Sequence, residues 1–295
     1  MGFCHLVGNE AVKNRLQTAV NQKKVTHSYL FLGPSGIGKT LFAKEFAKMI
    51  LCLEEENKPC NKCKSCLSFQ ENNQPDFIFI QPEDGTIKIE KIRAMQEKIL
   101  EKPILSGRKI YVIQDADTMT KEAQNCLLKT LEEPPSYITI VLVASNESKL
   151  LSTIRSRCMK IAFQKLSQEE LQTALQQMQV EDIPQSLYPM FEGSIQKAQR
   201  ILERRQTYEE IQEIFSHVER YHLLDVINRM DCLYKNKEIM DDILDYIMVL
   251  FSQKMVQDSK YIQYIETINQ VKNNLKANSN FDMNIDQLLF TIWEE

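Results

Sequence analysis

The chain has 295 residues and a mass of 34.4 kDa, with 43% hydrophobic residues, 26% charged residues and a net charge of −4. This is an ordinary globular composition, so it excludes wholesale disorder, collagen and long coiled coils. The purely apolar runs are too short to span a bilayer, and the first ten residues lack the basic and apolar segments of a secretory signal. We therefore expect a cytoplasmic protein of two or three domains with no membrane partner.

Charge and turn residues are distributed unevenly along the chain. Residues 1–203 hold 26 Lys and Arg against 24 Asp and Glu, whereas residues 204–295 hold 10 against 16. The last glycine is Gly193 and the last proline is Pro189. A long stretch without these residues favours helices over strands and tight turns. We predict an acidic bundle of about five helices over 205–295, which is a poor candidate for contact with a phosphate backbone.

The first 163 residues alternate between short β-rich runs and helical patterns. Strands are predicted at 29–32, 77–80, 110–113, 139–143 and 158–163, with helices at about 9–23, 39–52, 89–101 and 120–132. Near-continuous apolar strands separated by helices imply a buried parallel sheet with helices on both faces. The expected fold class is α/β plus all-α, with a sheet domain at 1–163, a small helical unit at 164–204 and the helical bundle at 205–295.

Eight residues directly after the first predicted strand match the phosphate-loop pattern G-x-x-x-x-G-K-[ST]. They are Gly33, Pro34, Ser35, Gly36, Ile37, Gly38, Lys39 and Thr40. The glycines let backbone N–H groups surround phosphate oxygens at the start of a helix. Lys39 should reach the β- and γ-phosphates, and the Thr40 hydroxyl should ligate Mg²⁺. The loop therefore predicts a site for ATP and Mg²⁺, and a glycine-rich turn that caps a helix is the alternative.

Four of the eight cysteines lie close together in the sequence. Cys52, Cys60, Cys63 and Cys66 form the pattern C-x7-C-x2-C-x2-C, which favours tetrahedral Zn²⁺. Four thiolates leave no open coordination position, so the zinc would be structural and would hold together a module at about 52–66. Disulfides and an iron–sulfur cluster are the alternatives, although nothing in the sequence indicates export to an oxidising compartment.

Four more segments occur in a fixed order with the phosphate loop. They read HSYLFLG from His27, KIYVIQDADTMT from Lys109, NCLLKTLEEPP from Asn125 and TIRSRC from Thr153. Together these segments resemble the AAA+ clamp-loader subunits of bacterial DNA polymerase III over about residues 5–200. The resemblance implies an AAA+ domain with a zinc insertion, a small helical lid, and a helical collar through which subunits assemble.

Two departures from the family pattern concern ATP hydrolysis. Family members usually carry Asp-Glu at the end of one strand, where this chain has Gln114 and Asp115. Glutamine is a weaker ligand for a hard dication, and a group displaced by ~1 Å can slow a reaction ~10²-fold. Hydrolysing members also carry an arginine where Gln196 stands. With these two departures the chain resembles the delta-prime group of the family, which implies that it has lost ATP hydrolysis of its own. In the alternative, Asp115 supports the metal after a shift of one residue.

The segment Ser156-Arg157-Cys158 matches the family motif whose arginine enters the ATP site of an adjacent subunit. The resemblance implies that Arg157 is an arginine finger in trans, a contribution of ~10³–10⁵ in rate in related systems. It also implies gamma/tau and delta subunits as partners, with the sliding clamp and primed DNA reached through the assembly. An active gamma/tau-type ATPase is the main alternative function, and a branch-migration helicase is a weaker one.

Asn146 follows the strand predicted at 139–143 and has two interpretations. It matches the family's sensor position near the γ-phosphate. Asparagine is also a common cap of helices and turns. The sequence leaves both interpretations open.

Overall fold

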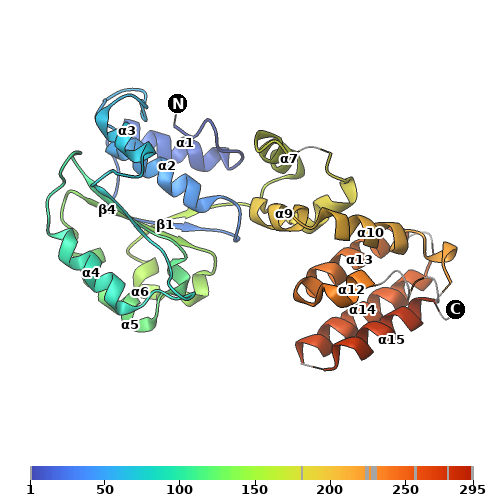
Figure 1. The fold of residues 1–295 in the computed structure, drawn as a ribbon. Coiled ribbons are helices and arrows are strands. Elements are labelled where there is room, and N and C mark those ends of the chain that lie inside the picture. The colour runs from blue at the N-terminus through green and yellow to red at the C-terminus, as the bar shows by residue number, and fades with distance from the viewer. Residues whose placement is uncertain are drawn as a thin grey trace. The chain divides into compact units, whose positions relative to one another are not determined.

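The computed structural model describes residues 2–180, 182–222, 226, 231–255, 258–277 and 279–293. The chain separates into two compact units. The first unit comprises Met1–Gln179 and Gly193–Ile195, and the second comprises Val180–Glu192 and Gln196–Glu295. Figure 1 labels helices and strands from both units.

A parallel sheet of five strands forms the middle of the first unit. Its strands are β1 (Ser28–Leu32), β2 (Phe77–Ile80), β3 (Lys109–Ile113), β4 (Ile138–Ala144) and β5 (Met159–Ala162), in the spatial order β2-β3-β4-β1-β5. Every strand predicted from the sequence is present, each within one residue of its expected ends. Because the strands are parallel, the segments that follow β1, β3 and β4 meet at one edge of the sheet, where ligands of such folds bind.

Helices cover both faces of this sheet (Figure 1). They are α1 (Glu10–Asn21), α2 (Lys39–Leu51), α3 (Lys64–Gln70), α4 (Ile89–Ile99), α5 (Lys121–Glu132) and α6 (Ser152–Arg155), with the 3-10 turns η1 (Ala116–Thr118) and η2 (Glu147–Lys149). The helix α7 (Gln168–Gln177) follows β5 in the same unit. The four long helices predicted for this part correspond to α1, α2, α4 and α5.

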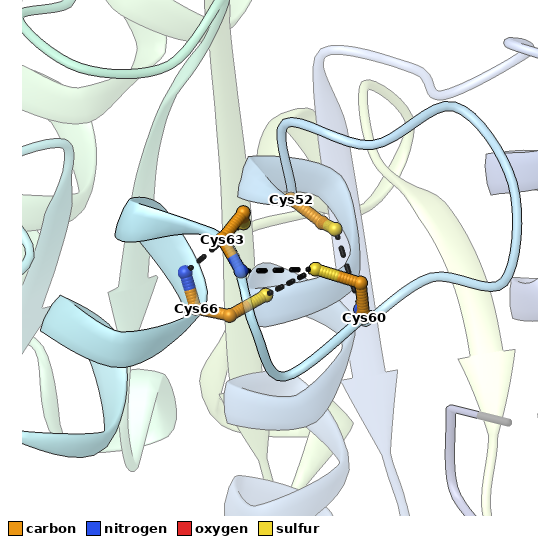
Figure 2. A group of neighbouring side chains, drawn as sticks. All are labelled: Cys52, Cys60, Cys63 and Cys66. Carbon is orange, nitrogen blue, oxygen red and sulfur yellow. Dashed lines mark hydrogen bonds between the residues drawn. The ribbon is translucent and has the colours of Figure 1, made fainter.

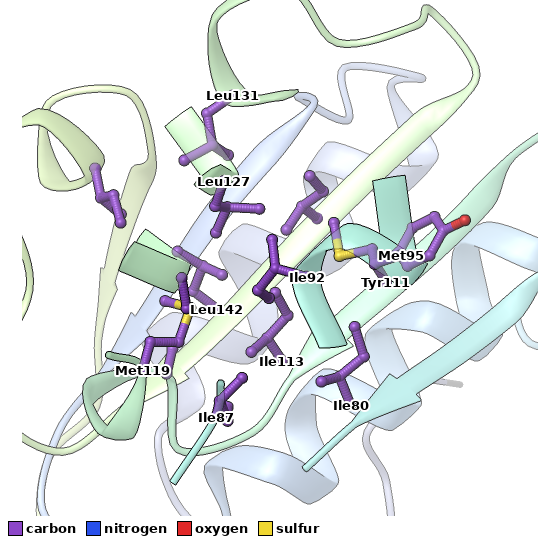
Figure 3. Packing of buried hydrophobic residues seen from close by; sticks show 14 of the residues in the cluster. Ile80, Ile87, Ile92, Met95, Tyr111, Ile113, Met119, Leu127, Leu131 and Leu142 are labelled. Atoms are coloured by element: carbon purple, nitrogen blue, oxygen red, sulfur yellow. The ribbon is translucent and has the colours of Figure 1, made fainter. Parts of the chain in front are cut away.

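Alternate residues of each strand enter two separate hydrophobic cores. Leu30 of β1 packs in the core beneath α4 and α5, which Figure 3 shows. Its neighbours Tyr29 and Phe31 pack on the opposite face with α1 and α2. Burial on both faces explains why the strands are almost continuously apolar. The α/β class expected from the sequence is thereby confirmed.

All the regular elements described in the second unit are helices. Its elements are η3 (Gln185–Leu187), α8 (Tyr188–Phe191), α10 (Arg205–Phe215), η4 (Val218–Arg220), α12 (Asp231–Lys235), η5 (Lys237–Ile239), α13 (Met240–Lys254), α14 (Lys260–Lys276) and α15 (Phe281–Trp293), and α9 (Ile195–Leu202) leads into it. The Tyr246 hydroxyl lies 3.0 Å from Ser186 Oγ and donates to Gln212 Oε1 at 3.1 Å. These bonds join η3, α10 and α13. The helical character predicted for 205–295 is confirmed for the residues of this range that the structure describes.

Residues 164–204 are divided between the two units, and the three-domain division made from the sequence stays a prediction. Within the described part of the chain, no helix combines the length and the apolar character that crossing a membrane requires.

Candidate nucleotide, metal and subunit-contact sites

The phosphate loop connects β1 to α2 at the ligand-binding edge of the sheet. Gly36 and Gly38 have φ angles of 75° and 89°, a conformation that residues with a Cβ rarely adopt. Gly33 is restricted by space instead, because a Cβ added there would lie 2.6 Å from the carbonyl oxygen of Phe163. Among the described residues, no side chain caps the start of α2. Its first N–H groups therefore remain available for phosphate oxygens.

Lys39 is held inside the loop that precedes it. Its Nζ donates to the carbonyl oxygens of Gly33 at 2.7 Å and Pro34 at 2.6 Å, and to Ser145 Oγ at 3.2 Å. Only 5% of the residue is exposed. Burial lowers the pKa of Lys39, and the nearby carboxylates Asp115 and Asp117 oppose that shift. The loop thus fixes a cation at the edge of the sheet, where a phosphate would lie.

The two residues after β3 interact with each other. Gln114 Nε2 donates to Asp115 Oδ2 at 3.0 Å, and the Gln114 backbone N–H donates to Ile80 O at 2.8 Å. Asp115 adopts the left-handed conformation with φ 47° at the start of η1. The carboxylate therefore lies at the same edge as Lys39, with one oxygen already bound by an amide. Of these two positions, only Asp115 offers a carboxylate to a metal ion.

Asn146 caps a turn beside this cluster. Its Oδ1 accepts from Ser148 N at 3.0 Å and from Ser148 Oγ at 2.7 Å. Its backbone N–H donates to Asp117 Oδ2 at 2.9 Å. The capping interpretation accounts for the contacts of this side chain.

Arg157 lies at the opposite end of β1 from the phosphate loop. Its carbonyl oxygen accepts from Ser28 Oγ at 2.6 Å, and Ser28 is the first residue of β1. The guanidinium donates from Nη1 to Thr153 O at 2.9 Å and pairs through Nη2 with Glu132 Oε1 at 2.7 Å. The Arg157 side chain is 34% exposed, so it is fixed in orientation and still open to solvent.

The four predicted cysteines come together between the end of α2 and the start of α3 (Figure 2). Their Sγ atoms all lie within 4.8 Å of one another, and Cys60 Sγ is 4.0 Å from Cys66 Sγ. The backbone N–H of Cys63 donates to Cys60 Sγ at 3.2 Å, and that of Cys66 donates to Cys63 Sγ at 3.4 Å. All four are free thiols, in contrast to the disulfide alternative.

The geometry and charge of this cluster fit a divalent metal ion. Zn–S bonds of about 2.3 Å in a tetrahedron place sulfur atoms about 3.8 Å apart, close to the separation of Cys60 and Cys66. Burial opposes ionisation of the Cys63 thiol, but hydrogen bonds from Leu53 and Cys66 N–H groups lower its pKa to about 7. Burial raises the pKa of Cys52 and of Cys66. A bound cation would stabilise the thiolates that burial disfavours.

Two buried polar residues with extensive contacts were not predicted. Gln124 of α5 donates to the carbonyl oxygens of Met119 and Lys149 and accepts from Leu151 N. A polar residue on the apolar face of this helix is a signal that can identify it from sequence. Asp76, just before β2, accepts three backbone N–H groups, and nothing local in the sequence indicates this.

The parallel sheet, the loop between β1 and α2 and the inserted cysteine module define an α/β domain of the AAA+ P-loop class. Residues 8–167 match the family described as DNA polymerase III, delta subunit, and the chain belongs to this family. The family expected from the sequence is thereby confirmed.

The chain is similar to proteins named as delta' subunits and to proteins named as tau/gamma subunits of DNA polymerase III. It is 37% identical over 164 residues to DNA polymerase III subunit delta' of Bacillus subtilis (strain 168), covering 56% of this chain and 50% of the relative. It is 33% identical over 170 residues to subunit tau/gamma of Haemophilus influenzae, covering 57% of this chain and 25% of the relative. The chain thus spans half or less of the length of these relatives.

Among solved structures, a DNA polymerase III gamma subunit-related protein from Thermotoga maritima MSB8 is 19% identical, with a TM-score of 0.47. The match covers 95% of this chain and 98% of that one. The Thermotoga maritima RuvB Holliday junction branch migration motor is 18% identical with a TM-score of 0.47, covering 85% of this chain and 76% of that one.

Proposed function

We propose that this chain is a delta-prime-like subunit of the DNA polymerase III clamp loader. In this function Arg157 enters the ATP site of an adjacent subunit, and the chain itself hydrolyses ATP weakly or not at all. The gamma/tau and delta subunits are its proposed partners, and the sliding clamp and primed DNA are reached through the assembly. The cytoplasmic location expected from the sequence is part of this proposal.

The position of Arg157 carries the proposal. Arg157 is bonded to Ser28 at the start of β1, whereas the phosphate loop begins at Gly33 beyond its end. A strand rises about 3.3 Å per residue, so these two points are roughly 16 Å apart. That distance exceeds the reach of one side chain. A partly exposed arginine in an intact Ser-Arg-Cys motif is therefore suited to a phosphate on another subunit.

The chain's own nucleotide site has the parts for binding rather than for hydrolysis. The loop holds Lys39 where phosphates would lie, so we propose that ATP and Mg²⁺ can bind. Gln114 replaces a carboxylate and its amide occupies an oxygen of Asp115. Gln196 stands where hydrolysing relatives carry an arginine. These residues support the loss of turnover.

We also propose that Cys52, Cys60, Cys63 and Cys66 bind one structural Zn²⁺. Four sulfurs within 4.8 Å of one another provide a closed donor set. The ion would supply charge compensation and a cross-link between α2 and α3.

An active gamma/tau-type ATPase is the second candidate function, favoured by the 33% identity to a tau/gamma subunit.

Replacement of Arg157 in the reconstituted loader tests the proposed function. With Arg157→Ala, the ATP site served by this arginine should lose ~10³–10⁵-fold in hydrolysis rate. Arg155→Ala is the matched control, because the Arg155 side chain is slightly more exposed than that of Arg157 and pairs with Glu147 at 3.7 Å instead. DNA-stimulated ATP hydrolysis that is unchanged by Arg157→Ala would reject the role in trans.

A further inference from the structure

The guanidinium of Arg157 is held by two separate elements of the first unit. Nη2 pairs with Glu132 Oε1 at 2.7 Å, and Nη1 donates to Thr153 O at 2.9 Å. Glu132 is the last residue of α5, and Thr153 belongs to α6. Since the guanidinium is planar and rigid, two anchors on different nitrogens fix the direction in which its remaining N–H groups point.

The helix that carries Glu132 is a rigid support. Leu127 and Leu131, on the preceding turn, are buried in the core beneath α4 and α5. The Glu132 side chain is nevertheless 50% exposed. The backbone of Glu132 is therefore held in place by the packing of α5, while its carboxylate reaches the surface beside Arg157.

Stability alone does not account for an acid at this position. The C-terminal end of a helix carries partial negative charge, which disfavours a carboxylate there. Glu132 ends α5 and Glu133 follows as its C-cap residue. An ion pair with this much exposure contributes only about 0–1 kcal/mol to folding. Orientation of the arginine is a larger effect, because a misplacement of ~1 Å can cost ~10²-fold in rate.

We propose that Glu132 is a positioning residue that orients Arg157 toward the transferring phosphoryl group of the adjacent subunit. The inference rests on the proposed function and goes beyond it, because it assigns a second residue of this chain to the shared ATP site. The remaining N–H groups of Arg157 contact the phosphate while Glu132 and Thr153 keep their bonds. Glu132 itself touches no substrate.

The test compares Glu132→Gln with Glu133→Gln in the reconstituted loader. Both variants remove one negative charge at the same helix end, and Glu133 lines a pocket beside α4 rather than contacting Arg157. We expect Glu132→Gln to lower kcat for DNA-stimulated ATP hydrolysis about tenfold or more, with KM for ATP and the amount of assembled loader unchanged. Glu133→Gln should match the unsubstituted loader, and Glu132→Asp should recover part of the lost rate.

A double variant separates positioning from other causes. If Glu132 acts through Arg157, Arg157→Ala with Glu132→Gln should be no slower than Arg157→Ala alone. Equal rates for Glu132→Gln and Glu133→Gln would overturn the inference, as would a loss of rate matched by a loss of assembly. If Arg157→Ala itself has no effect, the proposed function fails. If only Glu132→Gln has none, the arginine finger stands and the positioning role fails.

Discussion

Replacement of Asp76 by asparagine should weaken the fold around the cysteine module. Asp76 is completely buried, and its Oδ1 accepts from Ile104 N at 2.6 Å. Its Oδ2 accepts from Leu105 N at 2.8 Å and from Ser106 N at 2.7 Å. One carboxylate thereby fixes the loop that enters β3. Asparagine has the same shape but only one acceptor oxygen. It can therefore accept either the bond made by Oδ1 or the two bonds made by Oδ2, but not all three.

The expected loss of stability follows from those three bonds. One N–H would face the new NH₂ group without an acceptor, which costs about 1–3 kcal/mol. The other bonds would lose the strengthening that a charged acceptor provides, about 1 kcal/mol each. The neutral side chain recovers part of this because it is cheaper to bury. We expect a net decrease of about 2–4 kcal/mol in the free energy of unfolding, or roughly 4–16 °C in melting temperature for a unit of this size.

The same change should be detectable at the metal site. Ser106 Oγ donates to Leu51 O at 2.9 Å, next to Cys52. Gln74 links Asp76 to Ser65, through bonds of 2.7 and 2.6 Å, and Ser65 lies between Cys63 and Cys66. Loosening this network should therefore accelerate zinc release.

Urea unfolding followed by circular dichroism, with a colorimetric chelator reporting free zinc, measures both effects of Asp76→Asn. Asp84→Asn is the matched control, because Asp84 is exposed and has a left-handed φ of 48° that asparagine also tolerates. Stability within about 0.5 kcal/mol of the unsubstituted chain, the range of ordinary surface substitutions, together with unchanged zinc release would refute this reasoning.

Three further predictions concern the phosphate loop and the cysteines. Gly33→Ala should cost about 1–3 kcal/mol in stability and weaken ATP binding, because the added methyl would lie 2.6 Å from Phe163 O; a melting curve and an ATP-binding isotherm that both match the unsubstituted chain would contradict this. Cys60→Ser should reduce bound zinc, measured by elemental analysis, from one ion per chain to none. Zinc affinity of the unsubstituted chain should fall as pH falls through the Cys63 pKa of about 7, because protons compete for the thiolate, and retention independent of pH would argue against thiolate ligation.

The parts of this molecule that could be predicted are those whose characteristic residues lie close together in the sequence. The phosphate loop lies between an apolar strand and a helix, and the paired C-x-x-C steps carry their own spacing, so each was recognised without knowledge of distant contacts. The strands were recognised because burial on both faces leaves them almost wholly apolar.

Contacts between distant residues were not predictable in the same way. Arg157 and Glu132 each lie in a recognised segment, but only the packing of α5 beside α6 brings them together. The partners of Asp76 are backbone N–H groups of Ile104, Leu105 and Ser106. Backbone donors have no residue signature, so sequence alone gives no reason to connect them with this aspartate.

ATP turnover by the purified chain without partner subunits tests the central claim most directly. The phosphate-loop residues support binding of ATP. Gln114 and Gln196, which stand where hydrolysing relatives carry charged residues, oppose its hydrolysis. We therefore expect saturable ATP binding in the presence of Mg²⁺ that Lys39→Ala abolishes, with phosphate release no faster than that of the Lys39→Ala variant. Rapid Mg²⁺-dependent phosphate release that Lys39→Ala removes would contradict the account and identify the chain as an active ATPase.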